Sequence, residues 1–393
     1  MILNKKRLIM FIAFFLITIG NSGFLTILGI NNIVEYLGYA ILIIHIYIER
    51  ITIPNEYKKN ISIQFIIVWA LFSFGIIVQN ELSLLIKARL IFSMFILSSL
   101  AITSECYIES LKDVKVISYA ILFAMVCSTI LGAIGGFSLL TYATEGIFSD
   151  WGFNGGLQHK NYFAADIIAC FIGIYFYNKF NNNRKKYIIM LLLLFSLLIL
   201  ANSRGALVIF IIFFILANSD KLIKIKKEQR RYLLGFLIIL ICISGGIYFN
   251  SIVSNSGSYL YRFQGLINFF DYYSDSYFYL IFGNAEMAFS DTDVSYNENV
   301  RSVLGWDGTT ELALLSILIK NGILGLIGYI IIFINIIKCG VKKSKIQNKI
   351  MIISLLISFL ISGMIETYIS NINIVYSAFC YVVMAGLCNI KYD

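Results

Sequence analysis

The sequence predicts an all-α fold: a polytopic bundle of about 12 transmembrane helices. Of the 393 residues, 59% are hydrophobic, only 13% are charged and a single one is proline. The mean hydropathy is +0.83. A soluble domain of this length cannot bury so much apolar surface, whereas membrane helices expose it to lipid at no cost. We therefore expect one integral membrane domain over residues 1–393.

The apolar runs set the expected spans. Each run is long enough to cross about 30 Å of hydrocarbon as a helix. The basic, apolar start of the chain is interpreted as a retained first span, because no small-residue cleavage pattern follows it. The predicted spans are 8–29, 33–48, 62–79, 83–102, 116–134, 161–178, 187–201, 204–218, 232–250, 309–337, 350–366 and 371–389.

The lysines and arginines predict the orientation of these spans, because positively charged loops stay in the cytoplasm. Alternate connections and the two chain ends hold 24 of the 31 basic residues. Both termini are then cytoplasmic. The two long connections, 135–160 and 251–308, lie on the opposite, outer side. Since the basic residues sit in short loops between apolar runs, they report topology, and we expect no nucleic-acid partner.

Seven basic residues remain near the outer face, where the topology rule disfavours them. A cation drawn into the bilayer costs about 2.5–3.5 kcal/mol on insertion scales. An anion bound at the outer surface would account for all of them. They are Lys87, Arg89, Lys160, Arg204, Arg262, Arg301 and Lys320.

Three of these arginines belong to the outer connections or span ends. Arg204, in ANSRGAL, opens the eighth span beside a small serine and glycine that let a phosphate approach. Arg262 lies in the amphipathic segment YLYRFQGLINFF, and Arg301 lies in the acidic part of the long loop. Guanidinium groups bind phosphate oxygens in pairs without a metal. The competing interpretations are a helix-anchoring role for Arg204 and pairing with acidic neighbours for the other two.

Two more cations, Lys87 and Arg89, lie inside the fourth span, in NELSLLIKARLIF. A charge within a membrane helix is a functional-site hypothesis by default. A salt bridge between this pair and Glu81 is the alternative.

Proton-transfer groups occur at the starts of the sixth and tenth spans. His159, Lys160 and Asn161 follow one another in GLQHKNYF, and Glu311 lies four residues after Asp307 in DGTTELAL. A partly buried histidine or carboxylate there could accept a proton from a sugar hydroxyl. The alternatives are a structural interfacial histidine and a carboxylate that stabilises the positive end of its helix.

Metal chemistry is not expected. The only histidines are His45 and His159, and no carboxylates cluster at ligand spacing. The seven cysteines contain no CxxC pair, which argues against a thiolate metal site and a disulfide framework. We expect no cofactor.

With these residues identified, the chain resembles the superfamily of bacterial O-antigen polymerases and O-antigen ligases, integral-membrane glycosyltransferases of the GT-C type. The resemblance rests on motif order within about residues 150–330. The motifs are HKN at 159–161, SRG at 203–205, an arginine before an aromatic segment from Arg262 to Gly283, and a helix that ends in NGILGL. The first 130 residues match only in being hydrophobic.

The resemblance implies a transfer reaction at the periplasmic face of the inner membrane. A glycan on an undecaprenyl diphosphate donor moves to a hydroxyl of the next lipid-linked repeat unit. Arg204, Arg262 and Arg89, with Lys160 and Arg301, would bind the diphosphate. Glu311 or His159 would assist deprotonation of the acceptor, and Asn161, Asp307 and Lys87 would complete the polar site. Membrane lipid, a chain-length regulator and a flippase are the implied partners.

One departure distinguishes the two branches of this superfamily. Ligases have a His-Asn pair eleven residues before the first glycine of the GxxGL helix, whereas here Glu311 and Leu312 precede Gly322 at that distance. This favours a polymerase. The alternatives are a ligase that joins polysaccharide to lipid A-core or to protein and, from another class, a flippase of lipid-linked units. A flippase would show two related halves and polar residues along the midplane.

Overall fold

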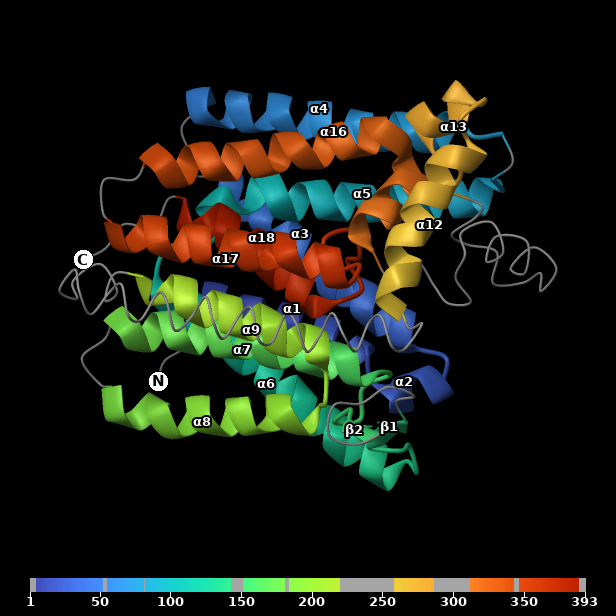
Figure 1. Cartoon of the computed structure of the whole chain (residues 1–393). Helices are drawn as coiled ribbons and strands as arrows, with labels where there is room; N and C mark the ends of the chain where they lie inside the picture. The colour runs from blue at the N-terminus through green and yellow to red at the C-terminus, as the bar shows by residue number, and fades with distance from the viewer. Residues whose placement is uncertain are drawn as a thin grey trace, which may run out of the picture.

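In the computed structural model, the chain forms a bundle of long helices that lie side by side, with two shorter helices, α12 and α13, across one end (Figure 1). The structure describes residues 5–51, 55–80, 82–142, 151–180, 184–219, 258–285, 312–342 and 346–388. The helices that run along the bundle are α1 (Lys5–Gly20), α3 (Asn31–Ile51), α4 (Asn55–Val78), α5 (Leu84–Ile102), α6 (Leu111–Ile134), α7 (Lys160–Phe180), α8 (Arg184–Leu200), α9 (Arg204–Ala217), α16 (Ala313–Lys342), α17 (Ile346–Ile365) and α18 (Val375–Leu387).

Apolar side chains hold these helices together and also cover their outer surface. Helix α1 packs against α3 and α6, α6 against α7, α4 against α5 and α16, and α17 against α9. The core is rich in isoleucine, leucine and phenylalanine, while many residues of the same types stay exposed. An exposed apolar surface of this kind is stable in lipid and costly in water.

By length and composition, six of the described helices can cross a membrane. They are Asn31–Ile51, Asn60–Val78, Leu84–Glu105, Leu111–Ile134, Ala313–Lys342 and Asn348–Ile365. Three shorter apolar helices accompany them, Tyr187–Leu200, Arg204–Ala217 and Val375–Leu387. The prediction of an all-α membrane protein is thus confirmed. Each predicted span overlaps a described helix except 232–250, which lies outside the described residues. The number of twelve spans stays a prediction.

One end of the bundle, which we call the basic end, brings both ends of the described chain together. Here Lys6 of α1 contacts Glu49 of α3 at 3.4 Å and Glu109, before α6, at 2.6 Å. Next to it, Arg7 Nε donates to Asp113 Oδ1 at 2.7 Å. Asp113 also accepts from the backbone of Ser110 and so caps α6. These ion pairs fix the start of α1 against α3 and α6.

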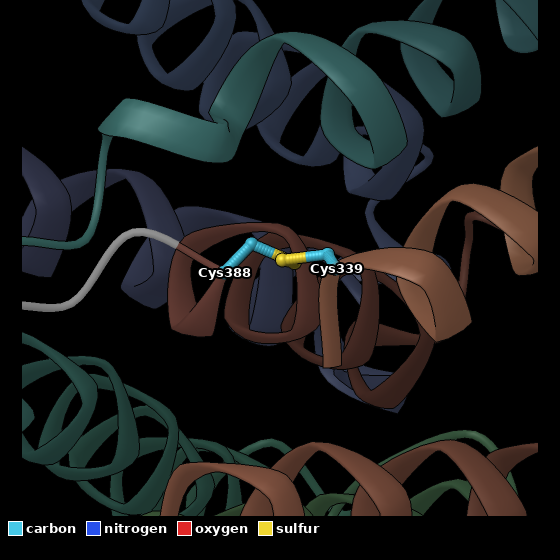
Figure 2. Close-up of a disulfide and its surroundings, with 2 residues drawn as sticks. All are labelled: Cys339 and Cys388. Carbon is cyan, nitrogen blue, oxygen red and sulfur yellow. A yellow bond between two sulfur atoms is a disulfide. The ribbon is translucent and has the colours of Figure 1, made fainter. Parts of the chain in front are cut away.

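A disulfide lies at the same end. It joins Cys339, in the last turns of α16, to Cys388, directly after α18 (Figure 2). The sequence argued against a disulfide framework, so this bond within the described part of the chain was not expected. The two residues are 49 positions apart in sequence. Only the packing of the helices brings their Cα atoms to 5.7 Å, so no local spacing could have revealed the pair.

The opposite end, which we call the loop end, carries the short elements. They are α2 (Gly23–Ile27), the paired strands β1 (Leu140–Tyr142) and β2 (Trp151–Phe153), α12 (Ser258–Tyr272) and α13 (Tyr277–Phe282). The predicted first outer loop, 135–160, corresponds to the connection from the end of α6 to the start of α7. Of the predicted second loop, 251–308, the described residues are 258–285.

The first predicted span, 8–29, is wrong in its extent. Helix α1 ends at Gly20, and Ser22 is extended, with φ −67° and ψ 132°. Ser22 forms an antiparallel bridge with Leu157, and the backbone N–H of Gly23 donates to the carbonyl of Gly156 at 2.9 Å. Pairing with the connection before α7 therefore interrupts the helix, a contact between distant segments that an apolar run does not reveal.

Candidate functional site

The polar start of α7 lies at the loop end, where His159 caps the helix. The backbone N–H of Asn161 donates to His159 Nδ1 at 3.1 Å, and the His159 carbonyl accepts from Tyr162 N at 3.1 Å. Because Nδ1 accepts a hydrogen bond, the neutral ring carries its proton on Nε2. In this form the Nε2–H of His159 is a hydrogen-bond donor, and the proton-acceptor role that the sequence suggests for this residue stays a prediction.

The charge state of His159 follows from its surroundings. Burial, and to a lesser degree the neighbouring Lys160 charge, lowers the pKa of His159 below its usual value near 6.5. Protonation of Nδ1 would also remove the acceptor of this hydrogen bond, because the hydrogen on Nδ1 would then repel the backbone N–H of Asn161. The neutral donor is thus the stable form at neutral pH.

The connection between α17 and α18 supplies a carboxylate to the same place. Asn161 Nδ2 donates to Glu366 Oε1 at 3.0 Å, and the Tyr368 hydroxyl donates to the Asn161 carbonyl at 3.1 Å. Glu366 is half-buried. Two hydrogen bonds on one residue therefore hold a carboxylate beside His159, in surroundings that permit proton transfer.

Two cations lie next to this group. Lys160 is 8% exposed, and its Nζ donates to the carbonyl of Asn202 at 3.3 Å. Asn202 has φ +50°, and its side chain donates to the Trp151 carbonyl of β2 at 3.1 Å. This turn leads into Arg204, the first residue of α9. The positive charge of Arg204 is close enough to act electrostatically on Lys160. Like charges this close to a helix N-terminus favour an anion between them.

Gly152 of β2 allows this approach. A Cβ atom there would lie 2.5 Å from both the Ala201 carbonyl oxygen and Lys160 Cδ. Any larger residue would push the strand away from Lys160 and the start of α9.

A second group of charges comes from α3, α5 and α16. Glu35 of α3 is only 3% exposed, and the positive charge of Arg89 acts on its carboxylate. Arg89 is exposed and also acts on Lys320 of α16. Close by, Lys87 Nζ donates to the carbonyl of Ile77 at 3.0 Å. Of the two cations in the fourth predicted span, Arg89 therefore acts on a buried carboxylate, whereas Lys87 donates to a backbone carbonyl.

The two groups belong to one polar region. The carboxylates of Glu366 and Glu35 both act electrostatically on Tyr162 of α7, whose ring lies 6.2 Å from that of His159. The structure thus brings His159, Lys160, Asn161 and Arg204 together, and Arg89 is linked to them through Glu35.

The other predicted site residues lie outside the described part of the chain or are described only by their backbone. Glu311, Arg301 and Asp307 are not among the described residues. Arg262 lies in α12 at the loop end, and its side chain is outside the description. Within the described ranges, no three histidine, cysteine or acidic residues are placed to hold a metal ion.

Sequence reasoning missed two acidic residues of the site, Glu35 and Glu366. Both occur in otherwise apolar surroundings, NIVEYL and GMIETY. The rule that made Arg89 a candidate applies equally to a carboxylate within a predicted span. Applied to acids, it would have found both.

Comparison of the chain with protein-family models and with curated proteins finds no match in either case.

Proposed function

We propose that the protein is a polymerase of surface-polysaccharide repeat units, an O-antigen polymerase or a close equivalent, that needs no metal. The observation that carries the proposal is the meeting of two cations, Lys160 and Arg204, with a donor histidine and a hydrogen-bonded carboxylate at the loop end. The lipid-linked glycan is both donor and acceptor. The bundle places this group at the end of apolar helices, where a membrane-anchored substrate can reach it.

The cations account for the leaving group. In the transfer, the bond between the sugar C1 and the diphosphate oxygen breaks, and undecaprenyl diphosphate leaves. Arg204 and Lys160 would stabilise the negative charge that develops on that oxygen, helped by the N-terminus of α9. His159 Nε2–H would donate to a phosphate oxygen. Arg89, with Lys87 nearby, would assist from the start of α5, and Arg262 would act from α12.

The carboxylate accounts for the acceptor. The acceptor hydroxyl oxygen forms the new bond to C1, and its proton passes to a base. Among the described residues Glu366 fits this part best, because Asn161 fixes its Oε1. Glu311 remains the candidate that the sequence suggests.

The surroundings of the site follow from the charge distribution. The connections that hold most lysines and arginines in the sequence would face the cytoplasm of a bacterial inner membrane, together with the basic end. The loop end would then face the periplasm, where a flippase delivers lipid-linked units and a chain-length regulator acts on the growing polymer.

Deletion of the gene in its native host tests the proposal. We expect cells whose lipopolysaccharide, or the equivalent surface glycan, carries single repeat units, with long chains restored by the intact gene. The readout is the ladder of chain lengths on a gel. A ligase would instead leave the lipid A-core without any repeat, and unchanged long chains would overturn the proposal.

A further inference from the structure

A pocket of about 370 Å³ opens at the loop end, apart from the His159 group. It lies between the α4–α5 connection and α13. Its described lining residues carry no formal charge: three have side-chain amides, two are aromatic and one is aliphatic. They are Gln79, Asn80, Leu82, Phe278, Tyr279 and Asn284.

One wall of the pocket is held rigidly by Gln79. Its side chain is buried, and Nε2 donates to the carbonyls of Phe282 at 2.8 Å and Gly75 at 3.1 Å. Oε1 accepts from the backbone N–H of Ala285 at 2.7 Å. A contact to the Lys320 carbonyl at 3.3 Å extends the network to α16. This residue therefore ties α4, α13 and α16 together at the base of the pocket.

Two glycines allow α13 to come this close to α16. Gly283 has φ +84° and Gly322 has φ +59°, a region that favours glycine. A Cβ atom on Gly322 would lie 2.3 Å from the Ile281 carbonyl oxygen. The pocket is therefore part of a tightly packed junction and is formed before any ligand arrives.

The opposite wall is an ordered set of aromatic rings. Phe278 packs on Phe282 with ring centres 4.9 Å apart, and Tyr279 packs on Tyr273 at 5.1 Å. Asn284 Nδ2 donates to the Tyr273 hydroxyl at 3.1 Å. The Phe278 ring is nevertheless 42% exposed, so part of its surface is available to a ligand.

We propose that this pocket binds an uncharged sugar ring of the lipid-linked glycan. Side-chain amides both donate and accept, as sugar hydroxyls require, and an aromatic face packs against the C–H face of a pyranose. The volume lies in the usual range for a small-molecule site. That the sugar belongs to a lipid-linked substrate rests on the proposed function. That the pocket can bind a sugar rests only on its lining residues.

The position of the pocket fits a diphosphate-linked glycan. The carbonyl of Ile77, which accepts from Lys87 Nζ, lies two residues before Gln79, and the Lys320 carbonyl contacts Gln79 directly. Lys87 and the backbone of Lys320 therefore lie near the pocket, although neither lysine lines it. A lipid chain is the other occupant to consider, but it has no polar group for the side chains of Asn80 and Asn284, whereas Gln79 is already hydrogen-bonded within the protein.

Saturation-transfer NMR on the purified full-length protein in nanodiscs tests the proposal. The probes are glucose, galactose, N-acetylglucosamine and N-acetylgalactosamine. We expect ring-proton signals from at least one of them, with an affinity that falls about tenfold in Asn284→Ala and in Phe278→Ala, as loss of one hydrogen bond or one packed ring implies. Tyr277→Ala is the matched control: this neighbouring aromatic is 75% exposed and does not line the pocket.

Two results would overturn the inference. One is the absence of signal from all four sugars; the other is a signal that is equal in the wild type and in Phe278→Ala. Phe278 is partly exposed, so this variant decides the matter even if Asn284→Ala fails to fold. A third result would identify a lipid site instead. In it, decyl phosphate displaces the bound sugar, and the affinity for the sugar is the same in the wild type and in Phe278→Ala.

Chain-length analysis in cells separates this inference from the proposed function. If the gene deletion removes long chains but Phe278→Ala neither shortens them nor weakens sugar binding, the pocket assignment fails and the polymerase stands. If sugar binding depends on Phe278 while the deletion leaves long chains intact, the pocket stands and the polymerase fails.

Discussion

The two ends of the bundle use charge in different ways. At the basic end, Lys6 and Arg7 each contact a carboxylate directly, at 2.6 and 2.7 Å. At the loop end, the Lys160 ammonium donates to a backbone carbonyl, and the Glu366 carboxylate accepts from the amide of Asn161. Opposite charges that contact each other hold helices together, whereas an ammonium held by a neutral carbonyl, as in Lys160, keeps its field for a ligand. The difference indicates a structural end and a functional end.

The largest expected effect is on activity, from Arg204→Ala at the loop end. Loss of one group that stabilises the leaving diphosphate should reduce polymerisation at least about a hundredfold. Cells should then show single-repeat glycan, with normal amounts of the protein in membranes. The matched control is Arg50→Ala at the basic end, which should leave long chains. Equal glycan chain lengths in the two variants would contradict the assignment of a functional loop end and a structural basic end.

A smaller loss of activity is expected for Glu366→Gln. The glutamine oxygen can still accept from Asn161, so the fold should be kept while the proton acceptor is lost. We expect about a tenfold to hundredfold decrease in rate, measured with lipid-linked repeat units and the purified protein. Glu366→Asp should recover part of it. Full activity of the glutamine variant would assign the base elsewhere, with Glu311 the next candidate.

At the basic end, Asp113→Ala should affect stability rather than chemistry. This side chain is buried, caps α6 and pairs with Arg7. Arg7 is partly exposed, which reduces the effect, so we expect a loss of roughly 2–3 kcal/mol in unfolding free energy. Thermal unfolding in detergent would measure it. Activity per folded molecule should not change; a selective loss of activity would show that this end takes part in the reaction.

The smallest expected effect concerns pH. Because the pKa of His159 is lowered, the neutral ring and its cap on α7 should persist as pH falls through 6.5 and should be lost only below that value. Activity should follow the same curve. Lys160→Met removes a neighbouring positive charge, so it should raise the pKa of His159 and move the acid limb of the profile to higher pH. If the acid limb of the activity profile does not shift in Lys160→Met, a group other than His159 controls the loss of activity at low pH.

The general architecture could be predicted from the sequence because apolar length alone decides which segments prefer lipid. The break at Asn21 and Ser22 could not, since it results from pairing with Leu157 in a distant segment. The site shows the same division. The HKN and SRG motifs mark residues that meet in space, but the partner of Asn161 is Glu366, 205 positions away. No local pattern encodes such a contact.

The interruption of α16 at Gly322 has a consequence for how the protein sits in its bilayer. As one straight rod, the 30 residues of this helix would measure about 45 Å, well above the roughly 30 Å of a hydrocarbon layer. Gly322 leaves the helical conformation, with φ 59° and ψ −160°, and the part that follows, 323–342, measures about 30 Å on its own. In Figure 1, α16 turns at the loop end, next to α12. The straight part alone is therefore long enough to cross a hydrocarbon layer, so the turns before Gly322 would not need to lie within it.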